Sequence, residues 1–326
     1  GVKYLTIISF SYFTMTASFV VMMLMRSVER VWFPTLVSMF TVLLNTFLNY
    51  LLIKGNYGFP ALGVEGAAIA TVISGASGTL FLVGFMILSK EEVYKVKFRR
   101  IKEISREFVS MLSKKALPVA INETVWGLGM SAYLMAIGFI SADAIASVQI
   151  SNQIMGLFWV ANAGISTACA IMIGNKLGEN NLELAKQWGK KFVKLSFVAG
   201  LVFGIILFVS SGFISNQFTE VSDVVRNNLR IILMVFSFYV PIKFSNALQI
   251  IGTLRAGGDT KFALFAEIFP LWGFGVPMAF ILSIYTSLPI YFIIGIINLE
   301  EIIKFFLVLK RFLSYKWLKN LTLEAE

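Results

Sequence analysis

Six ionisable side chains lie inside long apolar runs of this chain: Glu123, Lys243, Glu267, Glu300, Glu301 and Lys304. An ionised group in the hydrocarbon of a bilayer costs about 2.5–3.5 kcal/mol on insertion scales, so each is a functional candidate by default. Buried carboxylates bind and release protons or small cations, and a neighbouring lysine competes with those cations for the same oxygens. The chemistry that these residue types predict is therefore reversible ion binding.

Glu123 is the strongest candidate of the six. It follows Asn122 at about 8 Å from the start of its apolar run, at 1.5 Å per residue, and Trp126 comes shortly after it. Lys243 lies in the middle of another run. We predict a Glu123–Lys243 ion pair in a protein-lined cavity. Either a proton or Na⁺ displaces Lys243 from Glu123, which makes Glu123 the predicted Na⁺ ligand, or the pair is static and fixes helix packing.

The remaining charged residues predict two further features. Glu300 and Lys304 are four residues apart on one helical face, a spacing that predicts an internal ion pair. Glu267 lies five residues into its run, where it either lines a cavity or sits at the membrane interface.

A polar stripe follows one helical face in the run 144–174. Its members fall at positions i, i+3, i+4 and i+7: Gln149, Asn152, Gln153 and Gly156. On a membrane helix, such a stripe either bonds neighbouring helices or lines a water-filled cavity. We count its three amides, with Trp126, among the predicted cavity-lining residues.

The composition excludes several kinds of chemistry. The chain has no histidine, and its one cysteine, Cys169, lies inside an apolar run. Histidine ligands, a histidine base, an intrachain disulfide and a thiolate metal site are therefore ruled out. Neither a His-Glu-x-x-His motif nor a Gly-x-Ser-x-Gly elbow is present. We predict that the protein is not an enzyme and uses no organic cofactor.

The elements that must position these residues are membrane helices. Apolar residues make up 57% of the chain and charged residues 14%, with a mean hydropathy of +0.80, whereas soluble domains have about 45–50% and about 25%. A span needs about 20 apolar residues. The predicted fold is an all-α polytopic membrane protein with nine spans, near 4–25, 33–53, 64–88, 118–141, 144–174, 192–213, 229–253, 262–284 and 288–310.

The net charge of +10 does not indicate nucleic-acid binding, because the basic residues are sorted by membrane side. Of the 28 Lys and Arg, 22 lie in segments that share one side, and four lie in the alternate segments. This is the positive-inside pattern, and it predicts a cytoplasmic C-terminus. Nine crossings then place the first residue outside, which fits a chain that lacks its first helices.

The order of apolar and basic segments predicts two lobes. Residues 1–88 would form three helices of the first lobe, and 118–313 would form six helices of the second. The stretch 89–117 is a basic cytoplasmic linker, either an amphipathic helix or a solvated segment. Residues 314–326 would be a cytoplasmic tail.

An arginine-led helix junction occurs twice, at Arg26 and at Arg255, which are 229 residues apart. Such a repeat between membrane helices is typical of two-lobed transporters. Only one apolar run precedes the first copy, whereas three runs lie between the linker and the second. We therefore expect about three helices to be absent from the start of the first lobe.

Prolines and glycines predict where the helices start, break and touch. Pro118 is expected to open a span, where proline is tolerated. Pro241, Pro270 and Pro277 lie inside spans and are expected to kink them. Gly200 and Gly204 form a small-xxx-small pair that predicts close helix packing.

Three stretches resemble the multidrug and toxic compound extrusion (MATE) family, nearest to its DinF-like prokaryotic branch. Residues 45–53 with GFPALGVEGAAIAT at 58–71 resemble the junction of the fifth and sixth helices. LPVAINE at 117–123 with Trp126 resembles the start of the seventh helix, and LRAGGDTKF at 254–262 resembles the loop between the tenth and eleventh.

The resemblance implies a monomeric, V-shaped, twelve-helix antiporter in the inner membrane of a prokaryote, of which this chain would be helices four to twelve. Such proteins export organic cations and other amphiphiles in exchange for Na⁺ or H⁺. Glu123 matches the family's seventh-helix cation-site glutamate. Asn246 stands where a related branch has an aspartate, which weakens a two-carboxylate Na⁺ site. The expected partners are organic cations and the lipid bilayer, and not nucleic acid.

Two alternatives stay open. A lipid-linked precursor flippase of the same superfamily would need a strongly cationic cavity, whereas the deep charges here are four acids and two lysines. A membrane scaffold without transport activity would give no gradient-driven flux.

Overall fold

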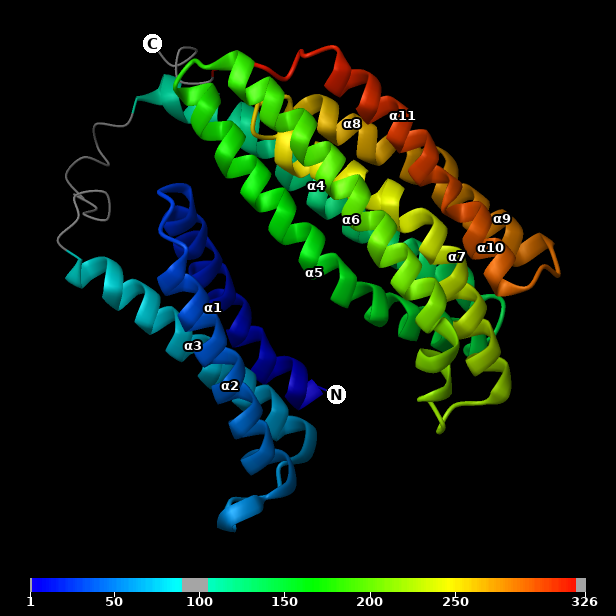
Figure 1. The fold of residues 1–326 in the computed structure, drawn as a ribbon. Coiled ribbons are helices and arrows are strands. Elements are labelled where there is room, and N and C mark those ends of the chain that lie inside the picture. Colours follow the sequence, from blue (N-terminus) through cyan, green and yellow to red (C-terminus); the bar gives the residue numbers. More distant parts are fainter. Residues whose placement is uncertain (1, 90–104, 321–326) are drawn as a thin grey trace. The chain divides into compact units, whose positions relative to one another are not determined.

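The computed structural model describes residues 2–89 and 105–320, and every regular element in these ranges is a helix (Figure 1). The chain divides into two compact units, Gly1–Ile104 and Ser105–Glu326. We call them the first and the second unit. The predicted all-α class is confirmed.

The first unit consists of three long helices, α1 (Val2–Ser27), α2 (Trp32–Lys54) and α3 (Gly63–Leu88), with a short turn, η1 (Asn56–Gly58). Helix α3 packs against both α1 and α2. Its glycines allow the close approach: a Cβ on Gly66 would lie 2.5 Å from the Leu52 carbonyl oxygen. Small residues at such crossings are typical of membrane helices.

The second unit carries the other predicted spans. Its elements are α4 (Arg106–Gly138), α5 (Ala142–Gly178), α6 (Leu182–Asn216), α7 (Asp223–Ala247), η4 (Leu248–Leu254), α8 (Thr260–Pro270), η5 (Leu271–Gly275), α9 (Val276–Tyr285), α10 (Ile290–Ile297) and α11 (Leu299–Leu313). Seven helices of the described residues are long and apolar enough to cross a membrane. The remaining predicted spans correspond to α4 and to α10 with α11.

Helix α7 is the core of the second unit, where it packs against α5, α6, α10 and α11. Two glycines let α6 approach it closely, because a Cβ on Gly200 would lie 2.6 Å from the Pro241 Cα. One on Gly204 would lie 2.6 Å from the Ser237 carbonyl oxygen. Pro241 has no N–H to bond that carbonyl, since proline cannot donate to residue i−4. The predicted small-residue packing is therefore confirmed.

The two spans for which the internal prolines predicted kinks each contain a π-helical segment. The segment η4 continues α7 beyond Pro241, and η5 follows Pro270 and precedes Pro277. π-turns inside helices are rare and occur often at functional sites.

One boundary prediction is wrong. Pro118 does not open a span but lies inside α4, which begins at Arg106 and is capped by the Ser105 hydroxyl. Residues 106–117 of the predicted linker are thus the first turns of α4, because their polar residues extend a membrane helix beyond its apolar run. The predicted linker residues 90–104 lie outside the described residues.

The arginine-led repeat is a repeat of backbone structure. In the first junction, Glu29 N–H donates to the Arg26 carbonyl at 3.0 Å, and Arg30 N–H donates to the Met25 carbonyl at 2.9 Å. Glu29 has a φ of 61°, in the left-handed region that ends many helices.

The second junction repeats both hydrogen bonds at an offset of 229 residues. Gly258 N–H donates to the Arg255 carbonyl at 3.0 Å, and Asp259 N–H donates to the Leu254 carbonyl at 2.8 Å. Gly258 has a φ of 72°, like Glu29 in the first copy. The predicted junction repeat is therefore confirmed in the backbone.

Candidate functional site

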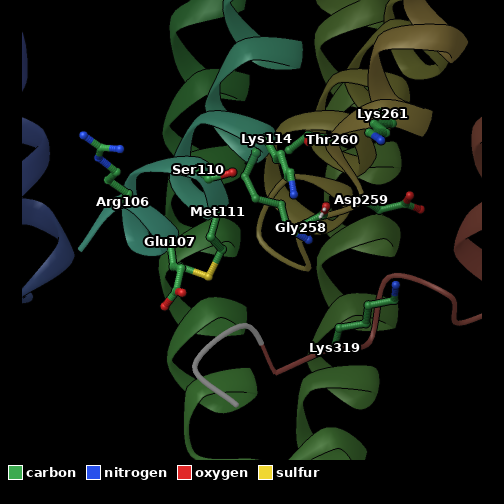
Figure 2. A pocket seen from close by; sticks show the side chains of 11 residues that line it. Arg106, Glu107, Ser110, Met111, Lys114, Gly258, Asp259, Thr260, Lys261 and Lys319 are labelled. Atoms are coloured by element: carbon green, nitrogen blue, oxygen red, sulfur yellow. Dashed lines mark hydrogen bonds between the residues drawn. The ribbon is translucent and has the colours of Figure 1, made fainter. Parts of the chain in front are cut away.

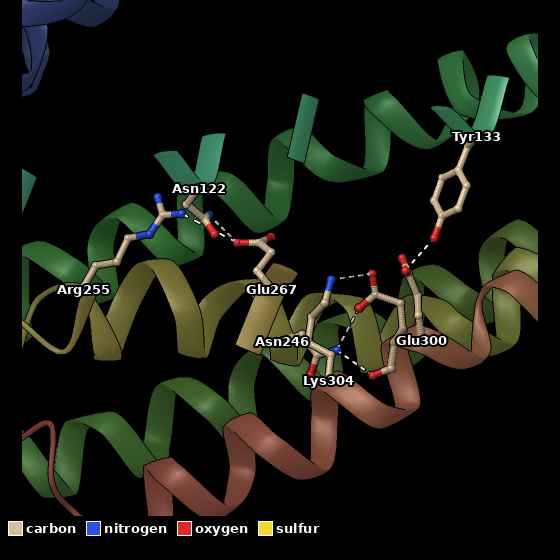
Figure 3. A network of polar contacts seen from close by, with 8 residues as sticks. Asn122, Tyr133, Asn246, Arg255, Glu267, Glu300 and Lys304 are labelled. Atoms are coloured by element: carbon tan, nitrogen blue, oxygen red, sulfur yellow. Dashed lines mark hydrogen bonds and ion pairs between the residues drawn. The ribbon is translucent and has the colours of Figure 1, made fainter. Parts of the chain in front are cut away.

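A buried network of charged groups lies between α4, α7 and α11 in the second unit (Figure 3). We call it the inner network, and it comprises Tyr133, Lys243, Asn246, Glu300, Glu301 and Lys304. The Lys304 Nζ lies 3.3 Å from Glu301 Oε1, and the two side chains are 6% and 13% exposed. Asn246 Nδ2 donates to Glu301 Oε2 at 2.8 Å and to its carbonyl at 2.9 Å. Glu301 is thus held from two sides.

Glu300 has a different environment. Its Oε2 accepts a hydrogen bond from the Tyr133 hydroxyl at 2.5 Å, and the residue is 5% exposed. Gly275, the last residue of η5, makes room for this contact, because a Cβ there would collide with the Tyr133 hydroxyl and the Glu300 carboxylate. The π-turn and its glycine therefore position a carboxylate–phenol pair.

Lys243 completes the charge balance of the inner network. It lies one turn before Asn246 on α7, with its Nζ 5.2 Å from the centre of the Phe236 ring. Glu300 and Glu301 both act on it electrostatically. Two carboxylates and two ammonium groups therefore share this part of the unit, and their charges cancel when all four are ionised.

Buried amide oxygens next to the network have no hydrogen-bond partner among the described residues. They are Asn246 Oδ1 and, one turn later in η4, Gln249 Oε1. Oxygen atoms of this kind, with carboxylates, are the ligands that hard cations prefer. Within the described ranges, no three or more His, Cys, Asp or Glu side chains are grouped so that they could hold a metal ion.

A second network joins α4, α8 and the turn between η4 and α8, and we call it the outer network. It comprises Asn122, Glu123, Arg255 and Glu267. Arg255 Nη2 lies 2.8 Å from Glu123 Oε1 and 3.8 Å from Glu267 Oε2. Asn122 Nδ2 donates to Glu267 Oε2 at 2.5 Å (Figure 3). Glu123 is 59% exposed, whereas Glu267 is 16% exposed.

The predicted Glu123–Lys243 pair is wrong. Glu123 pairs with Arg255, the arginine of the repeated junction, and Lys243 belongs to the inner network. The predicted Glu300–Lys304 pair is also replaced, because the short contact joins Lys304 to Glu301 at i, i+3. The i, i+3 and i, i+4 spacings both put the lysine and a glutamate on one helical face. Glu300 bonds Tyr133 instead, which leaves Glu301 as the partner of Lys304.

Glu267 is placed inside the unit rather than at its edge, since it is mostly buried and bonded to Asn122. The polar stripe does share one face of α5, as predicted, and that face is exposed in the second unit: Gln149, Asn152, Gln153 and Gly156. Trp126 is also exposed, at 43%. Their predicted role as cavity-lining residues stays a prediction.

Tyr133 and Arg255 were not among the predicted site residues. A spacing signal existed for Tyr133, because Asn122, Gly129 and Tyr133 lie seven and four residues apart and fall on one helical face. All three face partners in the second unit, and a Cβ on Gly129 would lie 2.6 Å from Leu271 Cδ2. A tyrosine in an apolar run carries no charge, so the pattern of charged residues does not indicate it.

A helical bundle with buried, charge-balanced networks and broken spans defines a polytopic membrane protein of the transporter class. The MatE family model matches residues 118–281, which run from Pro118 inside α4 to Ile281 inside α9. The chain belongs to the MatE family.

Bacterial multidrug resistance proteins are similar to this chain in sequence. The chain is 28% identical over 256 residues to the probable multidrug resistance protein YoeA of Bacillus subtilis, covering 77% of this chain and 55% of that protein. It is 29% identical over 302 residues to the probable multidrug resistance protein NorM of Thermotoga maritima, covering 90% and 62%.

A structure of the outward-facing conformation of a multidrug resistance MATE family transporter has the same fold. The TM-score is 0.83 at 20% identity, covering 96% of this chain and 70% of that one. The chain spans between half and two thirds of the length of the two curated relatives.

Proposed function

We propose that this protein is a secondary active antiporter that exports organic cations in exchange for H⁺ or Na⁺. The observation that carries the proposal is the inner network, in which the buried Glu300 and the mostly buried Glu301 adjoin Lys304, and both carboxylates influence Lys243 electrostatically. Ionisable residues in this setting mark ion pathways and proton relays.

Charge balance supplies the exchange step. With all four groups ionised, the inner network is neutral and an organic cation meets no net repulsion. When one carboxylate binds a proton or Na⁺, the network gains one positive charge. In a low-dielectric interior such a charge disfavours a second cation strongly. The two cations therefore compete, which is the requirement for antiport.

Glu300 is the proposed exchange carboxylate. Glu301 is held by Lys304 and Asn246, whereas the hydrogen bond recorded for Glu300 comes from the Tyr133 hydroxyl alone. A phenol donates to an ionised carboxylate and accepts from a protonated one, so the pair survives in either state. Glu301 then serves as the fixed counter-charge of the lysines.

The outer network is the proposed site at which an arriving cation first binds. Glu123 retains its predicted role as a cation ligand, but with Arg255 as its competitor in place of Lys243. An arriving Na⁺ or organic cation displaces Arg255 from the exposed carboxylate. Arg255 also lies 3.8 Å from Glu267, which offers it a second partner during the exchange.

The choice between Na⁺ and H⁺ follows from which ligands take part. A proton needs Glu300 alone, whereas Na⁺ needs several oxygens, which Asn246 Oδ1 and Gln249 Oε1 would add. We propose an inner-membrane monomer with its basic loops and C-terminus in the cytoplasm, as the positive-inside pattern predicts.

The test is ethidium efflux from proteoliposomes that contain the protein expressed from its complete reading frame. A Na⁺ gradient and a pH gradient are imposed separately on wild type, Glu300→Gln and Glu123→Gln. Glu183→Gln is the matched control, since its pair with Lys186 is exposed. We expect Glu300→Gln to abolish coupled efflux and Glu123→Gln to reduce it.

Each result has a definite meaning. Efflux driven by one gradient names the coupling ion, and its loss in Glu300→Gln supports the inner network as the exchange site. Undiminished efflux in Glu300→Gln would refute that assignment, and loss in Glu123→Gln alone would move the site to the outer network. No efflux under either gradient would favour the flippase or the scaffold.

A further inference from the structure

A cavity of about 700 Å³ lies in the second unit, where the first turns of α4 meet the start of α8 (Figure 2). Figure 2 shows side chains from α4, from the turn before α8 and from the segment after α11 around it. It belongs to neither charge network, since its lining residues take no part in them. The cavity is therefore a separate feature of the unit.

The cavity is strongly basic. Five of its lining residues are lysine or arginine: Arg106, Lys114, Lys115, Lys261 and Lys319. Two acids, Glu107 and Asp259, also line it. The Asp259 carboxylate is already matched, because it accepts two hydrogen bonds from Arg311, at 2.5 and 3.0 Å. The lining therefore carries a clear excess of positive charge.

The start of α8 adds to this field. Asp259 occupies the N-cap position, yet its side chain makes no capping hydrogen bond because it is turned to Arg311. The first N–H groups of a helix that lack a cap attract anions, and the helix dipole acts in the same direction. Four other helices of the unit, α4 to α7, are capped by Ser or Asn side chains.

Thr260 gives an independent indication of a ligand. It lines the cavity and is 6% exposed, and its hydroxyl has no hydrogen-bond partner among the described residues. A buried hydroxyl without a partner costs free energy, so native structures leave few of them. An acceptor bound in the cavity would supply the partner that this hydroxyl lacks.

The surface beside the cavity is apolar. Phe108 and Leu112, one helical turn apart on α4, are 48% and 54% exposed. The first turns of α4 are thus amphipathic, with Ser110 and Lys114 lining the cavity on another face. A ligand with an anionic head group and apolar tails would contact both the basic and the apolar face, whereas a free inorganic anion would contact only the basic one.

We propose that this cavity binds the phosphate of an anionic phospholipid headgroup, with Lys114, Lys261 and the Thr260 hydroxyl as its main contacts. The acyl chains then lie along Phe108 and Leu112. Basic pockets between membrane helices on the cytoplasmic side bind such headgroups. The inference concerns lipid binding alone and holds whether or not the proposed antiport is correct.

The experiment measures lipid binding to the delipidated full-length protein in non-ionic detergent by native mass spectrometry. The probes are dioleoyl phosphatidylglycerol and dioleoyl phosphatidylcholine. The variants are Lys114→Gln/Lys261→Gln and, as a matched control, Lys191→Gln/Lys194→Gln on α6. The control lysines are exposed and do not line the cavity.

We expect the wild type to prefer phosphatidylglycerol and the cavity variant to lose about tenfold or more of that affinity, since a lysine near the headgroup contributes about 1 kcal/mol. The control variant should stay within about twofold, because its lysines lie outside the cavity. Equal affinity for both lipids, or equal losses in both variants, would overturn the proposal.

Two further arms identify the source of the phosphate. Inorganic phosphate and the soluble headgroup glycerophosphoglycerol are added as competitors. We expect both to displace the lipid only weakly, because they lack acyl chains. Displacement by inorganic phosphate at the affinity of the whole lipid would make the site a free-anion site and refute the lipid assignment.

Thr260→Val separates binding from folding. The hydroxyl has no internal partner to lose, so the variant should melt at or above the wild-type temperature. We expect its phosphatidylglycerol affinity to fall by about threefold to tenfold, the value of one ordinary hydrogen bond. Unchanged affinity would exclude Thr260 from the site.

Discussion

The inner and outer networks contain the same kinds of groups and differ in how much water reaches them. The inner pair, Lys304 with Glu301, is 6% and 13% exposed, whereas in the outer pair Glu123 is 59% exposed. A buried ion pair is costly to break, and an exposed one contributes little. The comparison predicts that the inner pair contributes more to stability than the outer pair does.

The largest expected effect is that of Glu301→Gln. Removing the carboxylate leaves the buried Lys304 ammonium without its ion-pair partner, so the free energy of unfolding should fall by about 3–5 kcal/mol. Chemical denaturation in detergent measures this. The control is Glu183→Gln, which breaks another i, i+3 pair with a lysine, but one that is 69% and 30% exposed. Similar losses in both variants would show that burial does not distinguish the networks.

Gly275→Ala should come next. The added methyl group would collide with the Tyr133 hydroxyl and the Glu300 carboxylate and push them apart. Overpacking of this kind costs about 1–3 kcal/mol. The matched control is Gly273→Ala, two residues earlier in η5, where a Cβ would lie 3.7 Å from Phe269. If thermal melting shows the two variants to be equal, Gly275 is not what positions the carboxylate–phenol pair.

Arg255→Gln tests the outer network. It removes the charge that faces Glu123 and Glu267, but Asn122 still bonds Glu267, so we expect a loss of about 1–2 kcal/mol. The control is Arg26→Gln at the matching position of the first junction. No described carboxylate of the first unit is buried, so this change should cost about 0.5 kcal/mol or less. Equal melting shifts would mean that both arginines serve only the turn.

Glu123→Gln should change stability least. Its carboxylate is largely exposed, and exposed pairs contribute about 0.2–1 kcal/mol. The effect on melting should shrink further as salt is raised, because screening weakens exposed pairs. A loss as large as that of Glu301→Gln, insensitive to salt, would place Glu123 among the buried charges and abolish the distinction between the networks.

Much of the fold could be predicted from the sequence because the bilayer sets the length of each apolar run. The class, the approximate spans, the breaks after Pro241 and Pro270 and the repeated junction were all predicted. The start of α4 was not, because a helix continues through polar residues beyond the membrane. The apolar pattern has no signal for where such a helix begins.

The charged residues of both networks, except Arg255, could be recognised from the sequence as unusual, but their pairs could not. Glu123, Lys243 and Glu300 were recognised because charge in an apolar run is rare. Their partners depend on how each helix is rotated about its axis and where it crosses its neighbours. The π-helical segments η4 and η5, which follow α7 and α8, change the rotation of each span by an angle that residue spacing does not reveal. Tyr133 and Arg255 take their places in the networks only through tertiary packing.

The charges of α11 have a consequence for how the protein is made. Glu300, Glu301 and Lys304 fall within five residues, and each would resist entry into the lipid on its own. Their partners Tyr133 and Asn246 stand on α4 and α7, which leave the ribosome earlier. Insertion of α11 therefore depends on α4 and α7 already being in the membrane, because their side chains pair with charged groups that would otherwise oppose its entry into the lipid.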